Sequence, residues 1–241
     1  GCVSMTQAQA PIPFAKDFED GSLAPLDTFN VSSDENWEVG SFSGDQFATI
    51  NGFQANANSN DWLITPRFNF DAISDSVFFR FDNAKNFGDG GLKLLISRDY
   101  DGQSNPDSSI FTWKDITSRA DLVEQQNYVD TPSGRISIND FPSEDSVYVA
   151  FQYTATPSSA TNWQLDNFRV FQKGELAQVP YKQDFENVSG LDDWQAVSLS
   201  SGNNWTRESF SGDNFAEMSG FQSDTVNEDW LVSPGFDLSN V

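Results

Sequence analysis

The 241-residue chain contains no histidine, one cysteine, and only 13 lysines and arginines against 36 aspartates and glutamates. Without histidine, it lacks the most common general base and the most common zinc ligand, and Ser-His-Asp and Cys-His catalytic devices are excluded. A single cysteine can form neither an internal disulfide nor a multi-thiolate metal site. These absences argue against the familiar hydrolytic and zinc-dependent enzymes.

The scarcity of basic residues gives the chain a net charge of −23. Nucleic-acid binding depends on cationic side chains that neutralise phosphates, so nucleic acid is excluded as a partner. The same argument applies to anionic membrane surfaces. A surface this acidic favours solubility and attracts cations.

The single cysteine, Cys2, follows Gly1 and precedes a polar stretch over residues 3–10. A Gly-Cys pair in this position resembles the end of a bacterial lipoprotein signal, where the cysteine becomes lipidated. We therefore predict lipidation of Cys2 and attachment to the outer membrane through that lipid. The alternative is an ordinary free cysteine. No apolar run approaches the ~20 residues that span a bilayer.

Aromatic residues are abundant, with 22 Phe, seven Trp and five Tyr. Alternating or continuous apolar runs predict strands at 76–81, 92–97, 146–153 and 163–171. Clusters of Gly, Asn, Asp, Ser and Pro between them are typical of turns. The sequence predicts one short helix, around 118–126. Many short aromatic strands with long loops predict an all-β fold, a jelly-roll β-sandwich rather than a tight barrel.

The beginning of one domain occurs twice. Residues 35–70 align without a gap to residues 203–238, and 17 of these 36 positions are identical. The Asp-Phe-Glu of 17–19 recurs at 184–186. A scaffold repeated along a chain is typical of binding or display proteins and predicts a tandem repeat.

The repeat also sets the predicted boundaries. The second copy has no counterpart of residues 74–171, and so short a piece buries too little surface to be stable alone. We expect it to continue into further residues or to be completed by strands from elsewhere. The predicted parts are a flexible tail at 1–11, a full domain at 12–173, a linker at 174–179, and the N-terminal part of a second domain at 180–241.

Several motifs occur in a characteristic order: DFE (17–19), SGDQFATINGF (43–53), DWLITPRFNF (61–70), LKLLISRDYDGQSNP (92–106), VYVAFQYT (147–154) and WQLDNFRV (163–170). Together they resemble the choice-of-anchor J domain, which is related to the cleaved adhesin domains of gingipain-type proteases and to MAM domains. The resemblance implies a jelly roll on secreted or outer-membrane-anchored bacterial proteins. Such domains are usually accessory; they bind cations, proteins, cells or glycans, and catalysis lies in another domain.

The resemblance also implies a structural calcium site. In similar jelly rolls, Ca²⁺ often lies where the first and last strands meet, and it takes six to eight oxygen ligands. We predict Glu19 and Asp166 as metal ligands, with Asp17 as a further ligand on the same strand face as Glu19. The alternative is that Asp17 and Glu19 are solvated and that Asp166 accepts from a turn amide. The loop at 99–107 lacks EF-hand spacing and is predicted to be a turn.

Three aromatic residues are candidates for ligand binding. Trp113 and Trp163 lie in or beside loop-like stretches, and Tyr100 lies in a turn, so each could offer a ring to a ligand. Trp62 has period-2 spacing and recurs in the second copy, as a packing requirement would dictate, so we predict that it is a core residue.

The sequence predicts a non-catalytic bacterial module, secreted or anchored at the cell surface, that mediates adhesion or assembly. Its partner would be a protein or a glycan. The first alternative is a carbohydrate-binding module. The second is an accessory region of a larger secreted hydrolase. A catalytic reading ranks third: acidic pairs for glycoside hydrolysis are possible in any chain this acidic, but no local pattern singles out a pair.

Overall fold

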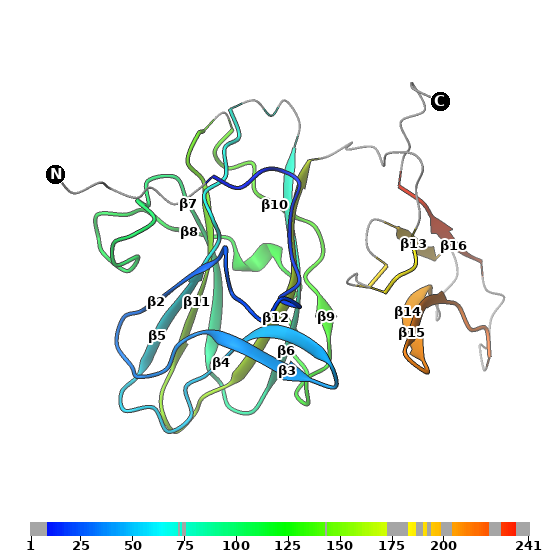
Figure 1. Cartoon of the computed structure of the whole chain (residues 1–241), viewed down its shortest axis with the longest axis horizontal. Helices are drawn as coiled ribbons and strands as arrows, with labels where there is room; N and C mark the ends of the chain where they lie inside the picture. The colour runs from blue at the N-terminus through cyan, green and yellow to red at the C-terminus, as the bar shows by residue number, and fades with distance from the viewer. Residues whose placement is uncertain are drawn as a thin grey trace. The chain divides into compact units, whose positions relative to one another are not determined.

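The computed structural model describes residues 9–71, 73, 76–142, 144–172, 183–186, 190–191, 194–198, 204–221 and 228–234. The chain divides into two compact units, Gly1–Lys173 and Gly174–Val241, and each is described by itself (Figure 1). Cys2 and the predicted linker lie outside the described residues. Within the described ranges, no helix has the length and apolar character that a membrane crossing requires.

The first unit is a sandwich of two antiparallel sheets (Figure 1). The larger sheet has the order β10 (Ile136–Ser137), β6 (Val77–Asn86), β12 (Asn162–Gln172), β4 (Asp45–Asn51) and β3 (Glu38–Phe42), with β1 (Phe14–Lys16) beside β12 and β9 (Thr131–Pro132) beside β6. The smaller sheet has the order β2 (Asp27–Asn30), β5 (Ser59–Ile64), β11 (Tyr148–Ala155), β7 (Gly91–Ser97) and β8 (Lys114–Asp115). The predicted jelly-roll sandwich and its four predicted strands are confirmed.

The main core lies between the two sheets. Val149, Phe151 and Tyr153 of β11 are fully buried there, because alternate residues of a strand face the same side. On the facing sheet, Phe79 and Phe81 of β6 are equally buried, and the Phe81 ring lies 4.8 Å from the Phe151 ring. The core is therefore mainly aromatic, as the composition indicates.

A bulge interrupts the alternation of β12. Trp163 and Leu165 are buried, and the next buried residue is Phe168 rather than position 167. The pairing of β12 with β6 shifts register between Asp166 and Arg169, and Asn167 has a φ of 53°. Asparagine tolerates this left-handed conformation better than most residues. The extra residue returns Phe168 to the core.

The predicted helix at 118–126 is wrong. Only Thr117–Arg119 is helical, as a 3₁₀ turn. Beyond it the backbone bonds to the sheet instead: Val123 N donates to Asn83 Oδ1 at 2.7 Å, and Asn83 Nδ2 donates to Asp121 O at 3.1 Å. The buried Asn83 of β6 thus supplies partners that a helix would have found within itself.

Asp140 holds the 3₁₀ turn against the end of β10. Its side chain is 6% exposed and receives two hydrogen bonds from Arg119, at 2.6 and 2.9 Å, and one from Lys114. The Arg119 hydrogen bonds are the main cause that lowers the pKa of Asp140 to about 2 from its usual 3.8. The folded state therefore gains stability above about pH 4 and loses this gain as the pH falls through about 2.

We expect Asp140→Asn to lower the free energy of unfolding by about 1–2 kcal/mol at pH 7, since its partners are partly exposed and screened. Urea unfolding at pH 7 and at pH 2 would measure this. The difference between wild type and variant should shrink at pH 2. An equal difference at both pH values would contradict the assigned role.

The described strands of the second unit repeat part of the first. β13 (Gln195–Ser198) pairs with β16 (Asp229–Val232), and β14 (Thr206–Phe210) pairs with β15 (Asp213–Glu217). Shifted by 168 residues, these pairings have the same register as β2 with β5 and β3 with β4. The repeated sequence therefore forms the same local pairings in both places.

Burial differs between the two units. Trp62 is 2% exposed, whereas its counterpart Trp230 is 56% exposed. Ile64 is 1% exposed, whereas its counterpart Val232 is 43% exposed. In the first unit, β11 pairs along β5 and Trp113 packs on Trp62, and these contacts shield Trp62 from water. Completion of the second unit by further strands stays a prediction.

Candidate functional site

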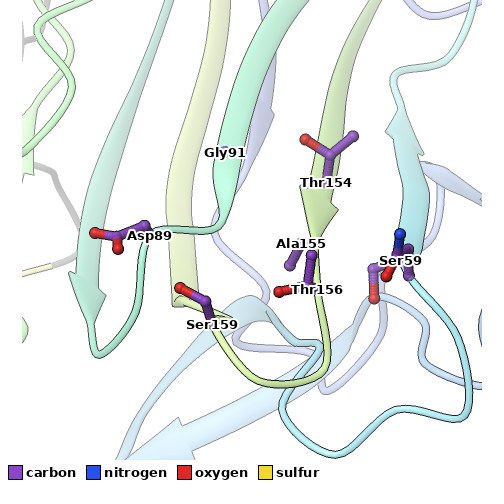
Figure 2. A pocket seen from close by; sticks show the side chains of 8 residues that line it. Ser59, Asp89, Gly91, Thr154, Ala155, Thr156 and Ser159 are labelled. Carbon is purple, nitrogen blue, oxygen red and sulfur yellow. The ribbon is translucent and has the colours of Figure 1, made fainter.

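An open hollow lies at one end of the first unit, where β5 begins and β11 ends. It has a volume of about 550 Å³ and is lined by Asn58, Ser59, Asp89, Gly91, Thr154, Ala155, Thr156 and Ser159. Figure 2 shows Asp89 and Ser59 on opposite sides, with Thr156 and Ser159 between them. The hollow thus joins the turn before β7, the end of β11 and the start of β5.

Glycines allow two turns to meet beside this hollow. Gly88 has a φ of 41°, and a Cβ added there would lie 2.1 Å from the carbonyl oxygen of Ala160. A Cβ on Gly90 would lie 2.8 Å from the backbone nitrogen of Thr161. The turn that carries Asp89 can therefore approach the segment after Ser159 only because side chains are absent.

The lining offers hydrogen bonds rather than acid–base chemistry. It presents four hydroxyl groups, the amide of Asn58 and one carboxylate, Asp89. Glycoside hydrolysis usually needs two carboxyl groups facing each other, and this lining has one. The sequence predicts only a turn at residues 88–91, so the hollow beside it could not be predicted from that segment. The Ser/Thr-rich segment 154–161 after a predicted strand was the available signal.

A second candidate surface is the tip of the β3–β4 hairpin. Phe42 at this tip is 75% exposed, and Phe210 at the tip of the β14–β15 hairpin is 74% exposed. Both lie in the identical sequence Ser-Phe-Ser-Gly-Asp, whose serine and glycine take the same left-handed turn. Packing explains repeated buried residues, but it does not explain a phenylalanine exposed to water in both copies.

The predicted metal ligands Asp17 and Glu19 have structural contacts. They follow β1 in a turn, which corrects the expectation that they share a strand face. Glu19 Oε1 accepts from Gln46 N at 2.8 Å, near the tip of the β3–β4 hairpin, and Asp17 Oδ1 accepts from Glu19 N at 3.3 Å. In the second unit Glu186 binds Asn214 in the same way, at 2.9 Å. Glu19 thus fastens a hairpin.

Asp166 lies directly opposite Asp82 in the paired strands β12 and β6. Its two oxygens accept from the backbone and side-chain amides of Asn167, at 2.7 and 3.1 Å. This is the turn-amide contact that the sequence left open as an alternative. Burial is the main cause that raises the pKa of Asp166 to about 9, and the charges of Asp45, Asp82 and Asp130 add to it.

The contacts of Glu19 and Asp166 are made with different partners, Gln46 and Asn167. Within the described part of the chain, no group of three or more Asp, Glu or Cys side chains is placed to hold a metal ion. The predicted calcium site at these residues therefore stays a prediction.

Two predicted ligand-binding aromatics pack on the outer face of the smaller sheet. Tyr100 is 5% exposed, and its ring lies 5.2 Å from Tyr148 and 5.3 Å from Trp113. Trp113 is half-buried against Trp62 at 5.2 Å and donates from Nε1 to Pro106 O. These rings pack the segment after β7 against the sheet. The ligand-binding role predicted for Tyr100 is corrected to packing, and that of Trp113, which is only half-buried, stays a prediction. The core role predicted for Trp62 is confirmed.

The third predicted ligand-binding aromatic, Trp163, belongs to the main core. It is 4% exposed, and its Nε1 donates to Gly90 O at 3.1 Å. Lys85 lies over the ring, 5.3 Å from its centre. Because no ring face is left for a ligand, Trp163 is corrected to a core residue that also fixes the turn beside the hollow.

Asp61 is a buried carboxylate that the sequence did not single out. It is 0% exposed, and its Oδ1 accepts no hydrogen bond. Burial raises its pKa to about 6, the Ser33 and Ser59 hydroxyls oppose the shift, and the charge of Glu35 adds to it. Ser59 also lines the hollow, so Asp61 lies behind the wall of that hollow.

Comparison with known proteins gives one family match. The model of a family described as Domain of unknown function (DUF5017) matches residues 67–182. No curated protein matches the chain. The match covers most of the first unit's sandwich and leaves out the repeated motifs before residue 67.

Several solved structures are similar. The K1 cleaved adhesin domain of Lys-gingipain from Porphyromonas gingivalis W83 is 15% identical, with a TM-score of 0.48 over 68% of this chain and 100% of that domain. The K3 domain is 16% identical, with a TM-score of 0.46 over 66% and 96%. The CBM22-1-CBM22-2 tandem from Paenibacillus barcinonensis Xyn10C is 15% identical, with a TM-score of 0.38 over 86% and 60%.

Cleaved adhesin domains, expected from the motifs, are thus among the similar structures. The relationship to choice-of-anchor J domains stays a prediction. The assignment of a β-sandwich rests on the strand pairings of this chain.

Proposed function

We propose that the chain is a non-catalytic module of a bacterial surface protein that mediates adhesion or assembly. The observation that carries this proposal is the exposed phenylalanine at the same hairpin tip in both copies, Phe42 and Phe210. Burying such a side chain against a partner is worth about 1.5–3 kcal/mol. Two tips on one chain would also bind a repetitive surface with avidity, wherever their spacing allows both to engage.

The chemistry of the described residues supports a module without catalysis. The chain has no histidine. The acids with the most strongly shifted pKa values are Asp61, Asp140 and Asp166, and all three lie outside the lining of the hollow. Ligand binding at the hollow would not require an acid–base pair.

The second candidate is a carbohydrate-binding module, and the hollow is the observation that favours it. Its four hydroxyls, one amide and one carboxylate match the hydrogen-bonding groups of a polyhydroxylated ligand. Its lining contains no aromatic ring, so binding would depend on hydrogen bonds in an open, wet site. We expect such binding to be weak for each site.

A structural calcium ion at Asp166 is part of the proposal. Its support is electrostatic: Asp166 is half-buried and feels the negative charges of Asp45, Asp82 and Asp130, which a hard cation would offset. Asp166 and the facing Asp82 would hold the ion. Glu19 fits less well, because one of its oxygens already fastens Gln46. Lipidation of Cys2 and attachment at the cell surface are proposed on sequence grounds alone.

Two sets of variants separate the two functions. We expect Phe42→Ala with Phe210→Ala to lower binding to immobilised proteins or cells at least ~10-fold, because both exposed anchors are lost. Phe87→Ala is the matched control, since Phe87 is also 60% exposed but lies outside the repeated segment. Solid-phase binding to a protein panel and a glycan array would be measured on the same preparations.

Glycan binding that is lost in Thr154→Ala with Ser159→Ala, and kept in the phenylalanine variants, would favour the carbohydrate-binding module. Unchanged protein binding in the phenylalanine variants would contradict the adhesion surface. Hydrolase activity in the purified chain would contradict both.

A further inference from the structure

Three of the chain's seven arginines gather on the outer face of the larger sheet. Arg80 of β6 lies directly opposite Arg169 of β12, and the next residue along β6, Phe79, faces the core. Ile136 of β10 pairs with Phe79. Since this pairing is antiparallel, Arg135 comes next to Arg80. These three arginines, which we call the arginine row, reach across the neighbouring strands β10, β6 and β12 (Figure 1).

Two phenylalanines adjoin the arginine row on the same face. Phe78 lies directly opposite Phe171, and their rings stack with centres 5.8 Å apart. The guanidinium of Arg135 lies over the Phe171 ring, 5.8 Å from its centre, and Arg135 is exposed. A guanidinium positioned over a ring keeps the N–H groups at its edge available, and these groups match a carboxylate through two parallel hydrogen bonds.

Arg98 is a similar arginine whose charge is matched within the chain. Its guanidinium lies 5.7 Å from the centre of the Phe141 ring, and its Nη1 pairs with Glu144 at 2.9 Å. Among the residues that the structure describes, Arg135 forms no ion pair with a carboxylate. The other two members of the arginine row interact within the chain, so Arg135 is the member best placed to contact a ligand.

We propose that the arginine row binds the carboxylate of an acidic sugar, a uronate, within a glycan, with Arg135 as the direct contact. This inference rests on the glycan-binding alternative of the proposed function and gives it a second ligand site, none of whose residues line the hollow. Charge complementarity supports it. Arg80 and Arg169 are like charges directly opposite each other, which is destabilising by itself, and a bound anion would offset their repulsion.

The sheet disfavours a peptide as the occupant of this face. Extended peptides usually bind by adding a strand to a sheet edge. β6 and β12 lie inside the sheet, and β10, at its edge, has only two residues, Ile136–Ser137. Recognition at the arginine row would therefore use side chains alone, as suits a sugar with its carboxylate and hydroxyl groups.

The charge of the whole chain limits which anionic polymers can bind. A net charge of −23 repels a dense line of phosphates. At physiological salt, exposed charges more than ~8 Å apart are largely screened. A glycan with separated carboxylates would therefore be governed by the arginine row that it contacts.

The full chain would be titrated by calorimetry with hexamers of galacturonate, glucuronate and mannuronate, and with the same hexamers after reduction of their carboxyl groups. We expect at least one uronate hexamer to bind, its reduced form to bind at least ~10-fold more weakly, and its affinity to fall as NaCl is raised. Arg135→Gln should lose at least ~10-fold in affinity for that hexamer. Arg135→Lys should lie between the two, because it keeps the charge but not the paired hydrogen bonds.

Two controls locate the binding. Arg98→Gln removes the other arginine that lies over a phenylalanine and should bind the uronate hexamer like wild type. Thr154→Ala with Ser159→Ala alters the hollow and should also keep uronate binding. Arg135 is exposed, so its variants should melt at the wild-type temperature, which circular dichroism would check.

The remaining outcomes would overturn the proposal. A chain that binds neutral glycans through the hollow but none of the uronate hexamers would refute the uronate site and leave the glycan-binding alternative standing. Uronate binding that is unchanged in Arg135→Gln, or lost equally in Arg98→Gln, would refute the role of the arginine row. Polyglutamate that binds as tightly as the uronate hexamer, with the same dependence on Arg135, would make an acidic peptide the occupant instead.

Discussion

Replacing Phe168 by alanine is expected to lower the free energy of unfolding of the first unit by about 3–5 kcal/mol. The Phe168 ring is completely buried and lies 5.3 Å from Phe18 and 5.7 Å from Phe79. It also lies 5.3 Å from Phe151, which belongs to the opposite sheet. Its removal opens a cavity where both sheets and the turn after β1 meet, and such a site collapses poorly.

Chemical unfolding followed by circular dichroism would measure the loss. Phe42→Ala is the matched control, because Phe42 is 75% exposed and its removal should change stability by less than about 0.5 kcal/mol. Equal stability losses in the two variants would show that Phe168 does not join the sheets as described.

Replacing Gly88 by alanine is the second change with a large expected effect. The new Cβ would meet Ala160 O at 2.1 Å and Ala160 C at 2.4 Å, both backbone atoms that cannot swing away. One turn must shift, so we expect a loss of about 2–4 kcal/mol and a disturbed hollow, since Asp89 follows directly.

Gly44→Ala separates the clash from the backbone strain. Gly44 also has a positive φ, of 96°, but a Cβ there would have nothing within 4 Å. We expect a loss of about 1 kcal/mol from the conformation alone. Thermal unfolding of both variants would test this, and a Gly88→Ala variant no less stable than Gly44→Ala would refute the close approach of the two turns.

The strands could be predicted because their alternation is visible in the sequence. In β11, Val149, Phe151 and Tyr153 alternate with the other face, and the structure buries them together. The bulge at Asn167 could not be predicted, because it depends on how β12 pairs with β6, a strand about 80 residues away in the sequence. The predicted helix at 118–126 does not form for the same reason. Its backbone groups at Asp121 and Val123 bond to the side chain of Asn83, which is distant in the sequence.

The candidate sites were harder to predict than the fold. Tyr100 and Trp163 are aromatic residues near turns, and nothing local distinguishes a ring that faces a ligand from one that packs on a sheet. Asp61 could not be singled out from the sequence, which contains 36 acidic residues. Only its buried position beneath the loop with Ser33 makes it unusual. The repeated Asp-Trp pair is visible in the sequence, but repetition alone does not show which of the two residues is unusual.

The two units share the same strand register but differ in burial. Strand pairing and burial, which occur together in most folded proteins, can therefore be considered separately here. Strand pairing and hairpin geometry recur wherever the repeated sequence occurs, so neighbouring residues encode them. The shielding of Trp62 from water does not recur at Trp230, so residues far away in the sequence must provide it. The same repeated segment thus forms the same pairings in both units, while the described residues of the two units differ in burial. The strand pairing of the repeated segment is therefore encoded locally, whereas in the first unit its burial is supplied by β11 and Trp113, which are distant in the sequence.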